Sequence, residues 1–178
     1  MGTTHEHERR FRQLFEAEAR SVLGYALRRT EAREDAADVV AETFAVAWRR
    51  IADVPPGAQA RPWLYGVARR VLANQRRGEL RRRRLADRLR ERLAAVDLAP
   101  LPAEDVGDRV RDALAQLPAH EREVLLLTSW EELLPAEIAV VLEVPAATVR
   151  TRLHRARARL RTLLVDDGVL TGAREDGR

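Results

Sequence analysis

Apolar residues along this chain recur every three or four positions, the spacing that places them on one side of an α-helix. Such stripes lie within residues 11–27, 35–51, 61–72 and 149–160. No segment shows the convincing alternation of apolar and polar residues that is typical of a half-buried strand. The pattern therefore predicts an all-α protein in which each helix packs by its apolar side.

The first three stripes predict the core of an amino-terminal helical domain. The first of them marks a helical pair or one long helix. A break before the third is indicated by Pro55, Pro56 and Gly57, while Pro62 suits the first turn of the helix that follows. The expected core positions are Phe11, Leu14, Phe15, Val22, Leu23, Ala26, Leu27, Val40, Phe44, Ala47, Trp48, Ile51, Trp63, Leu64, Val67, Val71 and Leu72.

Residues 135–160 predict two short helices around a tight turn, which is the layout of a helix-turn-helix. The second helix has its apolar stripe at Val149, Leu153, Ala156 and Leu160, so its opposite side is free for a partner. That side suits contact with base edges flanked by contact with phosphates. Its outward positions and flanks are Ala147, Thr148, Arg150, Thr151, Arg152, His154, Arg155, Arg157 and Arg159.

Charge is concentrated in two basic blocks, although the formal net charge is only +4. Residues 150–161 hold six arginines and no acid, and residues 69–92 hold eleven arginines against three acids. A solvated surface face is the alternative for the first block, but such faces interleave both signs, and here we expect no arginine to be offset. Residues 96–123 carry seven acids against three arginines and include a proline-containing stretch, which indicates a linker between two domains.

The polar sides of two amino-terminal helices present further candidates. Asp38, Glu42 and Arg49 point away from the apolar stripe of residues 35–51, and the simplest role for the two acids is stabilisation of a helix start. Trp63 begins the next helix; it could stack on single-stranded DNA, although packing is the favoured interpretation. The basic and amide side chains of that helix are Arg69, Arg70, Asn74, Arg76 and Arg77.

Several classes of function are disfavoured. The chain has no cysteine, which excludes disulfides and thiolate zinc sites. It has no long apolar run and no signal peptide, so we expect a cytoplasmic protein without membrane insertion. No metal-ligand cluster, glycine-rich phosphate loop or nucleophile-base arrangement is supported, so we expect no cofactor, no metal and no enzymatic activity.

Three stretches, in this order, resemble an extracytoplasmic-function (ECF) sigma factor, the compact class of bacterial RNA polymerase specificity subunits. Residues 35–50 resemble the polymerase-docking helix of that family, residues 61–77 its promoter-opening helix, and residues 117–159 its domain for the upstream promoter element. The resemblance extends over nearly everything from Phe11 to Leu164.

The resemblance implies a role for each set of candidates. Asp38, Glu42 and Arg49 would bind core RNA polymerase. The -10 element would be held as a single strand by a helix and its preceding loop, which in this family captures an extruded base; the residues are Gln59, Arg61, Trp63, Arg69, Arg70, Asn74, Arg76 and Arg77. The -35 duplex would be contacted by Thr148, Arg150, Thr151, Arg152, His154, Arg155 and Arg157.

The chain departs from the family pattern at four positions. Ala41 and Arg70 stand where glutamine and asparagine are common. Glu143 replaces the usual glycine of the helix-turn-helix turn, which would cost about 1 kcal/mol if its φ is positive. Leu134 is a poor helix N-cap, although Pro135 still favours a helix start.

The sequence thus predicts an ECF sigma factor with two small helical domains: residues 1–92, a flexible acidic linker at 93–108, a helix-turn-helix domain at 109–165 and a disordered tail at 166–178. Its expected partners are core RNA polymerase and promoter DNA, with an anti-sigma factor as a further possibility. We expect it to be monomeric when free. The alternatives are a free-standing helix-turn-helix regulator, which would bind duplex DNA without polymerase, and, less favoured, a nucleic-acid enzyme.

Overall fold

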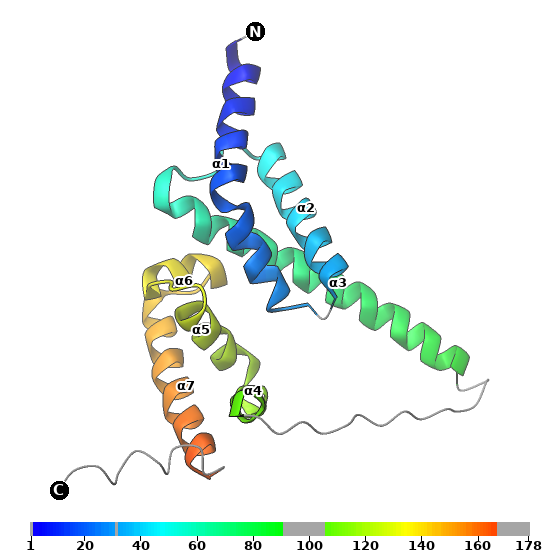
Figure 1. Cartoon of the computed structure of the whole chain (residues 1–178), viewed down its shortest axis with the longest axis vertical. Helices are drawn as coiled ribbons and strands as arrows, with labels where there is room; N and C mark the ends of the chain where they lie inside the picture. The colour runs from blue at the N-terminus through cyan, green and yellow to red at the C-terminus, as the bar shows by residue number, and fades with distance from the viewer. Residues whose placement is uncertain (1, 31, 91–105, 167–178) are drawn as a thin grey trace, which may run out of the picture. The chain divides into compact units, whose positions relative to one another are not determined.

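The computed structural model describes residues 2–30, 32–90 and 106–166, and within these ranges it is helical without a strand (Figure 1). This confirms the all-α prediction. The elements are α1 (Gly2–Leu27), α2 (Arg33–Arg49), the 3-10 helix η1 (Gly57–Gln59), α3 (Ala60–Arg90), α4 (Val106–Gln116), α5 (Ala119–Ser129), α6 (Pro135–Leu142) and α7 (Ala146–Asp166).

The described helices form two compact units. The first contains α1, α2, η1 and α3 together with Val140–Glu143, and the second contains α4, α5, α6 as far as Ala139, and α7. Most of the predicted linker and nearly all of the predicted tail lie outside the described residues. Helix α4 begins at Val106, inside the segment predicted as linker, and α7 continues to Asp166.

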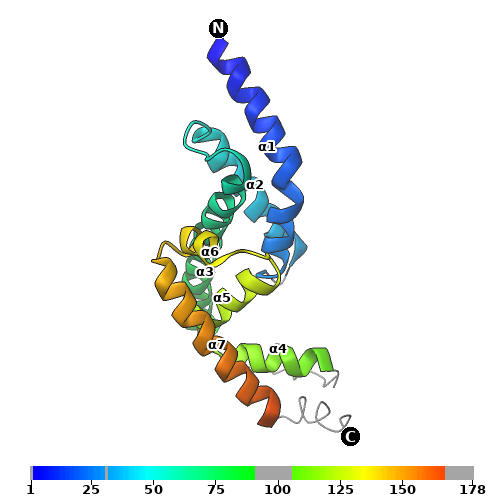
Figure 2. The same ribbon diagram turned by 90° about the vertical axis from the view of Figure 1, so that its left-hand side faces the viewer.

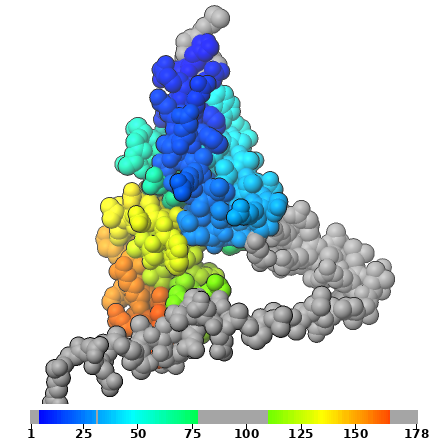
Figure 3. Space-filling model, viewed as in Figure 1, coloured from blue at the N-terminus to red at the C-terminus, as the bar shows by residue number. Residues whose placement is uncertain are grey.

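In the first unit, α1, α2 and α3 pack against one another. Figure 3 shows the surface of α1 in dark blue adjoining that of α2 in lighter blue. The centre of the unit holds Val22, Tyr25, Val39 and Leu64, none of which reaches solvent. The rings of Tyr25 and Tyr65 stack with their centroids 4.8 Å apart, which joins α1 to α3.

The core predicted for α1 and α2 is partly wrong. Phe15, Leu23, Leu27 and Trp48 are exposed, with about two-fifths of each residue's surface accessible. Each helix contacts its neighbours over a narrower arc than its apolar residues span, so the outer ones remain at the surface. In α2 the buried positions are centred on Val39 and on its neighbours one turn away, whereas Val40 is only half-buried.

The predicted break between α2 and α3 is present. Helix α2 ends at Arg49, and Gly57 has a φ of 60° at the start of η1, a conformation that glycine adopts without strain. Val54 and Ala60 are buried with Ile51, and Phe11, Leu14 and Trp63 pack against them. This cluster, here called the loop anchor, attaches both ends of the turn to the helical core.

The second unit is built around α7, which contacts both α4 and α5 (Figure 2). Val149, Leu153 and Ala156 are buried, as the apolar stripe predicted, and Leu160 is half-buried. Their contacts leave the opposite side of α7 at the surface.

Candidate nucleic-acid interface

The outward side of α7 carries the residues predicted to contact the -35 duplex. Arg150, Thr151, His154, Arg155 and Arg157 are exposed, whereas Thr148 and Arg152 are half-buried. The carbonyl oxygen of Pro145 accepts hydrogen bonds from the backbone amides of Thr148 (2.9 Å) and Val149 (3.2 Å), so the helix begins just before these residues.

Most arginines of this helix have no acidic partner among the residues that the structure describes. Within the described parts of the chain, no carboxylate pairs with Arg150, Arg155 or Arg157, which leaves their guanidinium groups available to an external anion. Arg159 is different: its Nη1 lies 2.9 Å from Oε2 of Glu121, whose side chain is only 5% exposed. The expectation that no arginine would be offset is therefore wrong for Arg159. The acid lies in α5, 38 positions away, which spacing within one helix cannot reveal.

The turn before α7 contains the predicted departure from the family pattern. Glu143 has a φ of 55°, so a residue with a side chain occupies the left-handed region there. Helix α6 begins at Pro135, as expected. The backbone amide of Leu134 donates to Oε2 of Glu137 at 2.8 Å, which is one half of a capping box and partly replaces the missing cap side chain.

Helix α3 presents the second basic surface. Arg69, Arg70, Asn74, Arg76 and Arg77 are all exposed. Arg76 donates to the carbonyl oxygen of Arg29 at 3.1 Å, and Arg77 donates to Oδ1 of Asn74. The opposite side buries Leu64, Val67, Val71 and Leu72, as predicted.

Trp63 and the loop before α3 lie where the loop anchor meets solvent. Trp63 is half-buried and packs on Ile51, Val54 and Ala60, so packing is one of its roles. Gln59 is exposed at the end of η1. Arg61 forms an ion pair with Glu18 of α1, with Nε and Oε2 2.7 Å apart.

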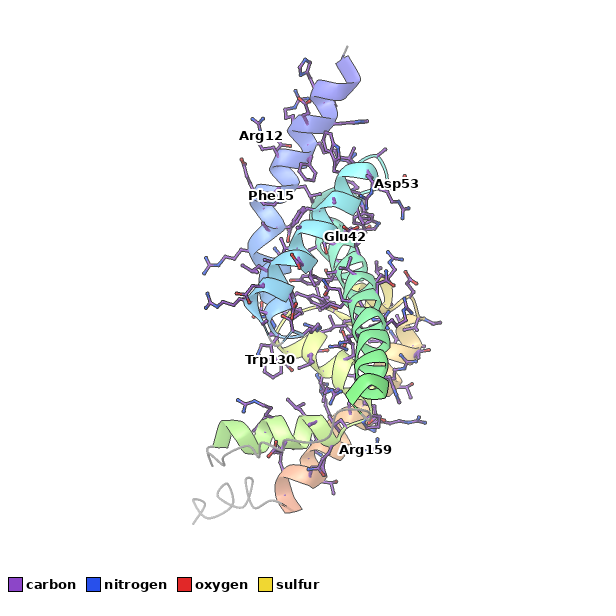
Figure 4. The ribbon with its side chains drawn as sticks, turned by 90° about the vertical axis from the view of Figure 1, so that its right-hand side faces the viewer. Arg12, Phe15, Glu42, Asp53, Trp130 and Arg159 are labelled. Atoms are coloured by element: carbon purple, nitrogen blue, oxygen red, sulfur yellow. The ribbon has the colours of Figure 1, made fainter. Side chains whose placement is uncertain are left out.

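Helix α2 carries the predicted polymerase contacts on its exposed side. Asp38, Glu42 and Arg49 all reach solvent, and Arg49 pairs with Glu42 at 3.1 Å with both side chains more than half exposed. Figure 4 labels Glu42 on this helix.

The structure brings predicted polymerase and DNA contacts to one groove of about 800 Å³ between α2 and α3. Asp38 and Glu42 lie on the α2 wall, whereas Arg70 and Asn74 lie on the α3 wall. Val67 and Val71 add apolar lining. The other predicted -10 residues do not line this groove.

Sequence reasoning assigned one surface feature to the core. Phe11, Phe15 and Trp48 line a shallow hollow of about 410 Å³ between α1 and α2, beside Glu8 and Arg12. Figure 4 labels Phe15 and Arg12 on α1. The rings of Phe11 and Trp48 meet edge to face with their centroids 5.2 Å apart, whereas those of Phe11 and Phe15 are tilted by 32°. Apolar periodicity marks such residues but does not say which of them a neighbouring helix covers.

In the described ranges, no helix combines the length and the apolar character needed to span a bilayer. In the same ranges, no three His, Cys, Asp or Glu side chains are grouped so that they could hold a metal ion.

Comparison with known proteins identifies both units. The family model for sigma-70 region 2 matches residues 14–84, and that for sigma-70 region 4 matches residues 107–160. The ECF RNA polymerase sigma factor SigL of Mycobacterium tuberculosis is 33% identical over 168 residues, which cover 89% of this chain and 90% of SigL. The chain belongs to the ECF sigma factors of the sigma-70 family.

Further relatives of this sigma factor support its assignment to the family. RNA polymerase sigma factor CnrH of Cupriavidus metallidurans is 34% identical over 147 residues, which cover 75% of each chain. The solved structure of CnrH in complex with the cytosolic domain of CnrY matches with a TM-score of 0.62 and 26% identity over 90% of both chains. A free-standing regulator is not favoured, because the region 2 match accounts for the first unit as well.

Proposed function

We propose that this ECF sigma factor divides promoter recognition between its two units, without catalysing a reaction and without a cofactor. The first unit docks on core RNA polymerase and holds the opened -10 strand, and the second contacts the -35 duplex. The observation that carries this proposal is the set of exposed α7 arginines, Arg150, Arg155 and Arg157, that have no acidic partner among the described residues, in a chain that also matches sigma-70 region 2.

Docking is assigned to the exposed side of α2, through Asp38, Glu42 and Arg49. The Glu42–Arg49 pair is solvent-exposed, and such pairs contribute about 0.2 to 1 kcal/mol, so both side chains can exchange this contact for one with the polymerase. The shared groove supports coupling between docking and -10 contact, because Asp38 and Glu42 face Arg70 and Asn74 across it.

The -35 contact is assigned to Arg150, Thr151, His154 and Arg155, with Thr148, Arg152 and Arg157 at the flanks. Guanidinium groups can donate two hydrogen bonds to a guanine edge or bind a phosphate. Their lack of internal partners means that DNA binding breaks no ion pair within the described residues.

The -10 contact is assigned to the α3 surface and its loop. Arg69, Arg70, Arg76 and Arg77 supply charge for the strand backbone, while Asn74 and Gln59 supply amide groups for base edges. The half-exposed ring of Trp63 can stack on a base while it packs on the loop anchor. Arg61 lies beside these groups.

The sigma factor would act in the cytoplasm, as a monomer until it joins the polymerase. The solved CnrH structure is a complex with the cytosolic domain of CnrY, which supports the proposal that a protein partner, an anti-sigma factor, binds the present chain. Such an anti-sigma factor would prevent docking by covering the polymerase-binding side chains.

Transcription in vitro with core polymerase and a library of randomised promoters tests the proposal. We expect the full chain to select templates with two conserved elements, and a variant carrying Asp38→Ala and Glu42→Ala to lose polymerase binding. Glu34→Ala removes an exposed acid from the same helix and is the matched control. Failure to associate with core polymerase, together with tight binding of duplex DNA by the free protein, would favour the free-standing regulator instead.

A further inference from the structure

The ion pair between Glu18 and Arg61 connects the middle of α1 to the first turn of α3. Arg61 donates from Nε to Oε2 at 2.7 Å and from Nη2 to Oε1 at 3.4 Å, so the guanidinium faces both carboxylate oxygens. The Glu18 side chain is 13% exposed and that of Arg61 is 44% exposed, so the carboxylate is better shielded than in an ordinary surface pair while the guanidinium still reaches solvent. Charge-assisted, two-pronged contacts of this kind are stronger and more directional than neutral hydrogen bonds.

A second contact joins α1 to the other end of the same loop. Arg10 lies on α1, eight residues before Glu18. Its Nη2 donates a hydrogen bond to the carbonyl oxygen of Val54. Two helical turns of α1 therefore hold the loop at its start and at its end. The loop anchor adds apolar contacts of Phe11 and Leu14 with the same segment.

Only the tip of the loop is left uncovered. Residues 56–59 are exposed, whereas Val54 and Ala60 on either side are buried. The tip includes Gln59, which the proposed function assigns to the -10 strand. A loop whose ends are held in place loses less conformational entropy when its tip binds a ligand.

We propose that Glu18 is a positioning residue for promoter opening: through Arg61 it holds the loop at residues 56–60 in the conformation that receives the -10 strand. Arg61 acts through this contact and not by binding DNA itself. This inference rests on the proposed function, which assigns the loop to the opened -10 strand. It changes the role of Arg61, because its guanidinium is already engaged with a shielded carboxylate.

The decisive experiment compares single variants with a charge exchange in the full chain bound to core polymerase. Opening is followed by the fluorescence of 2-aminopurine in the -10 strand. We expect Glu18→Ala and Arg61→Ala each to slow opening about five- to tenfold, the size of one charge-assisted contact. The double variant Glu18→Arg, Arg61→Glu should recover much of the rate, because the pair is re-formed in the opposite sense. Glu16→Ala, which removes an exposed acid from the same helix, is the matched control and should leave opening unchanged.

If Arg61 instead binds a phosphate, the outcome is opposite. Glu18→Ala would then leave opening unchanged or increase it, and the charge exchange would be inactive because it places a carboxylate against the DNA. Either result overturns the inference. If the unaltered protein fails to open any promoter with core polymerase, the proposed function fails, and the loop measurement below still tests the contact alone.

Amide hydrogen exchange of the free protein separates positioning from general stability. We expect Glu18→Ala to raise exchange at residues 57–60 while the amides of α2 keep their protection. Equal loss of protection in α2 would mean that the pair stabilises the whole first unit, and would overturn the positioning role.

Discussion

Two arginines on α7, one helical half-turn apart, have different environments. Arg157 is exposed and has no acidic partner among the described residues, whereas Arg159 contacts the buried carboxylate of Glu121. Removal of one partner from such a pair leaves a charge that is poorly solvated. The first arginine is therefore free to contact phosphate, and the second fastens α7 to α5 (Figure 4).

We expect Arg159→Ala to lower the free energy of unfolding of the second unit by about 1 to 2 kcal/mol, less than for a fully buried pair because Arg159 is half exposed. Arg157→Ala should change it by less than about 0.5 kcal/mol but weaken promoter binding. Hydrogen exchange of the α5 and α7 amides measures the first quantity, and holoenzyme binding measures the second. Equal stability of the two variants, with equal loss of promoter binding, would return Arg159 to the DNA contacts.

Thr43 is a buried polar residue of α2. The residue is fully buried, and its hydroxyl has no hydrogen-bond partner among the described residues. Burial of a hydroxyl without a partner costs about 1 to 3 kcal/mol. Thr43→Val keeps the branched shape and removes this cost, so we expect the first unit to become more stable by about 1 kcal/mol.

Hydrogen exchange of the α2 amides measures the effect of this substitution. Thr162→Val is the control, because Thr162 is exposed and its hydroxyl donates to the carbonyl oxygen of Ala158 at 3.2 Å. It should change stability by less than about 0.5 kcal/mol. A destabilised Thr43→Val protein would mean that the hydroxyl has a partner in solution.

Among the elements, the helix-turn-helix forms although two of its residues are locally unfavourable. Leu134 supplies no cap, yet Glu137 accepts from its amide and α6 still begins at Pro135. Glu143 adopts a left-handed conformation between the two helices of the motif. Val149 and Leu153 in the helix after this turn are buried, and their packing offsets the conformational cost of the turn.

Glu143→Gly should therefore stabilise the helix-turn-helix by about 1 kcal/mol, because glycine adopts positive φ without steric cost. Ala158→Gly is the matched control: it places glycine at an exposed position within α7 and should destabilise by about 1 kcal/mol. Urea unfolding, monitored through hydrogen exchange of the α7 amides, gives both free-energy changes. A loss of stability in Glu143→Gly would show that the glutamate side chain contributes more than its backbone costs.

At the scale of the whole molecule, two weak contacts on one chain reinforce each other. Once one promoter element is bound, the second site meets its element at a high effective concentration, which can raise the overall affinity by 10² to 10⁴. The proposed function places the two contacts in different units, so each promoter element should report on a different set of side chains.

Promoters with one scrambled element test this division. We expect Arg155→Ala to weaken holoenzyme binding about tenfold on an intact promoter, within the range of one good base contact. On a promoter with a scrambled -35 element the same substitution should have little further effect. Asn74→Ala should behave in the converse way with a scrambled -10 element. Additive losses on every template would argue that the two units do not contact separate elements.

Many features of this sigma factor were predictable because they depend on neighbours in the sequence. Helix periodicity placed Val149, Leu153 and Ala156 in the core of the second unit and left Arg155 outside. Proline and glycine predicted the break before α3, and the motif order in the chain predicted the family. Periodicity and the proline and glycine signals act over a few residues, where backbone geometry alone decides which side chains share a face.

Tertiary structure alone decided which charges and rings have partners. Glu121 lies 38 positions from Arg159, and Glu18 lies 43 positions from Arg61, so no helical spacing joins either pair. Phe15 and Trp48 follow an apolar pattern and still reach solvent, because each helix contacts its neighbours over a narrower arc than its apolar residues span. A pattern along one helix indicates which side chains could be buried or paired. Their actual partners depend on how helices from distant parts of the chain pack together.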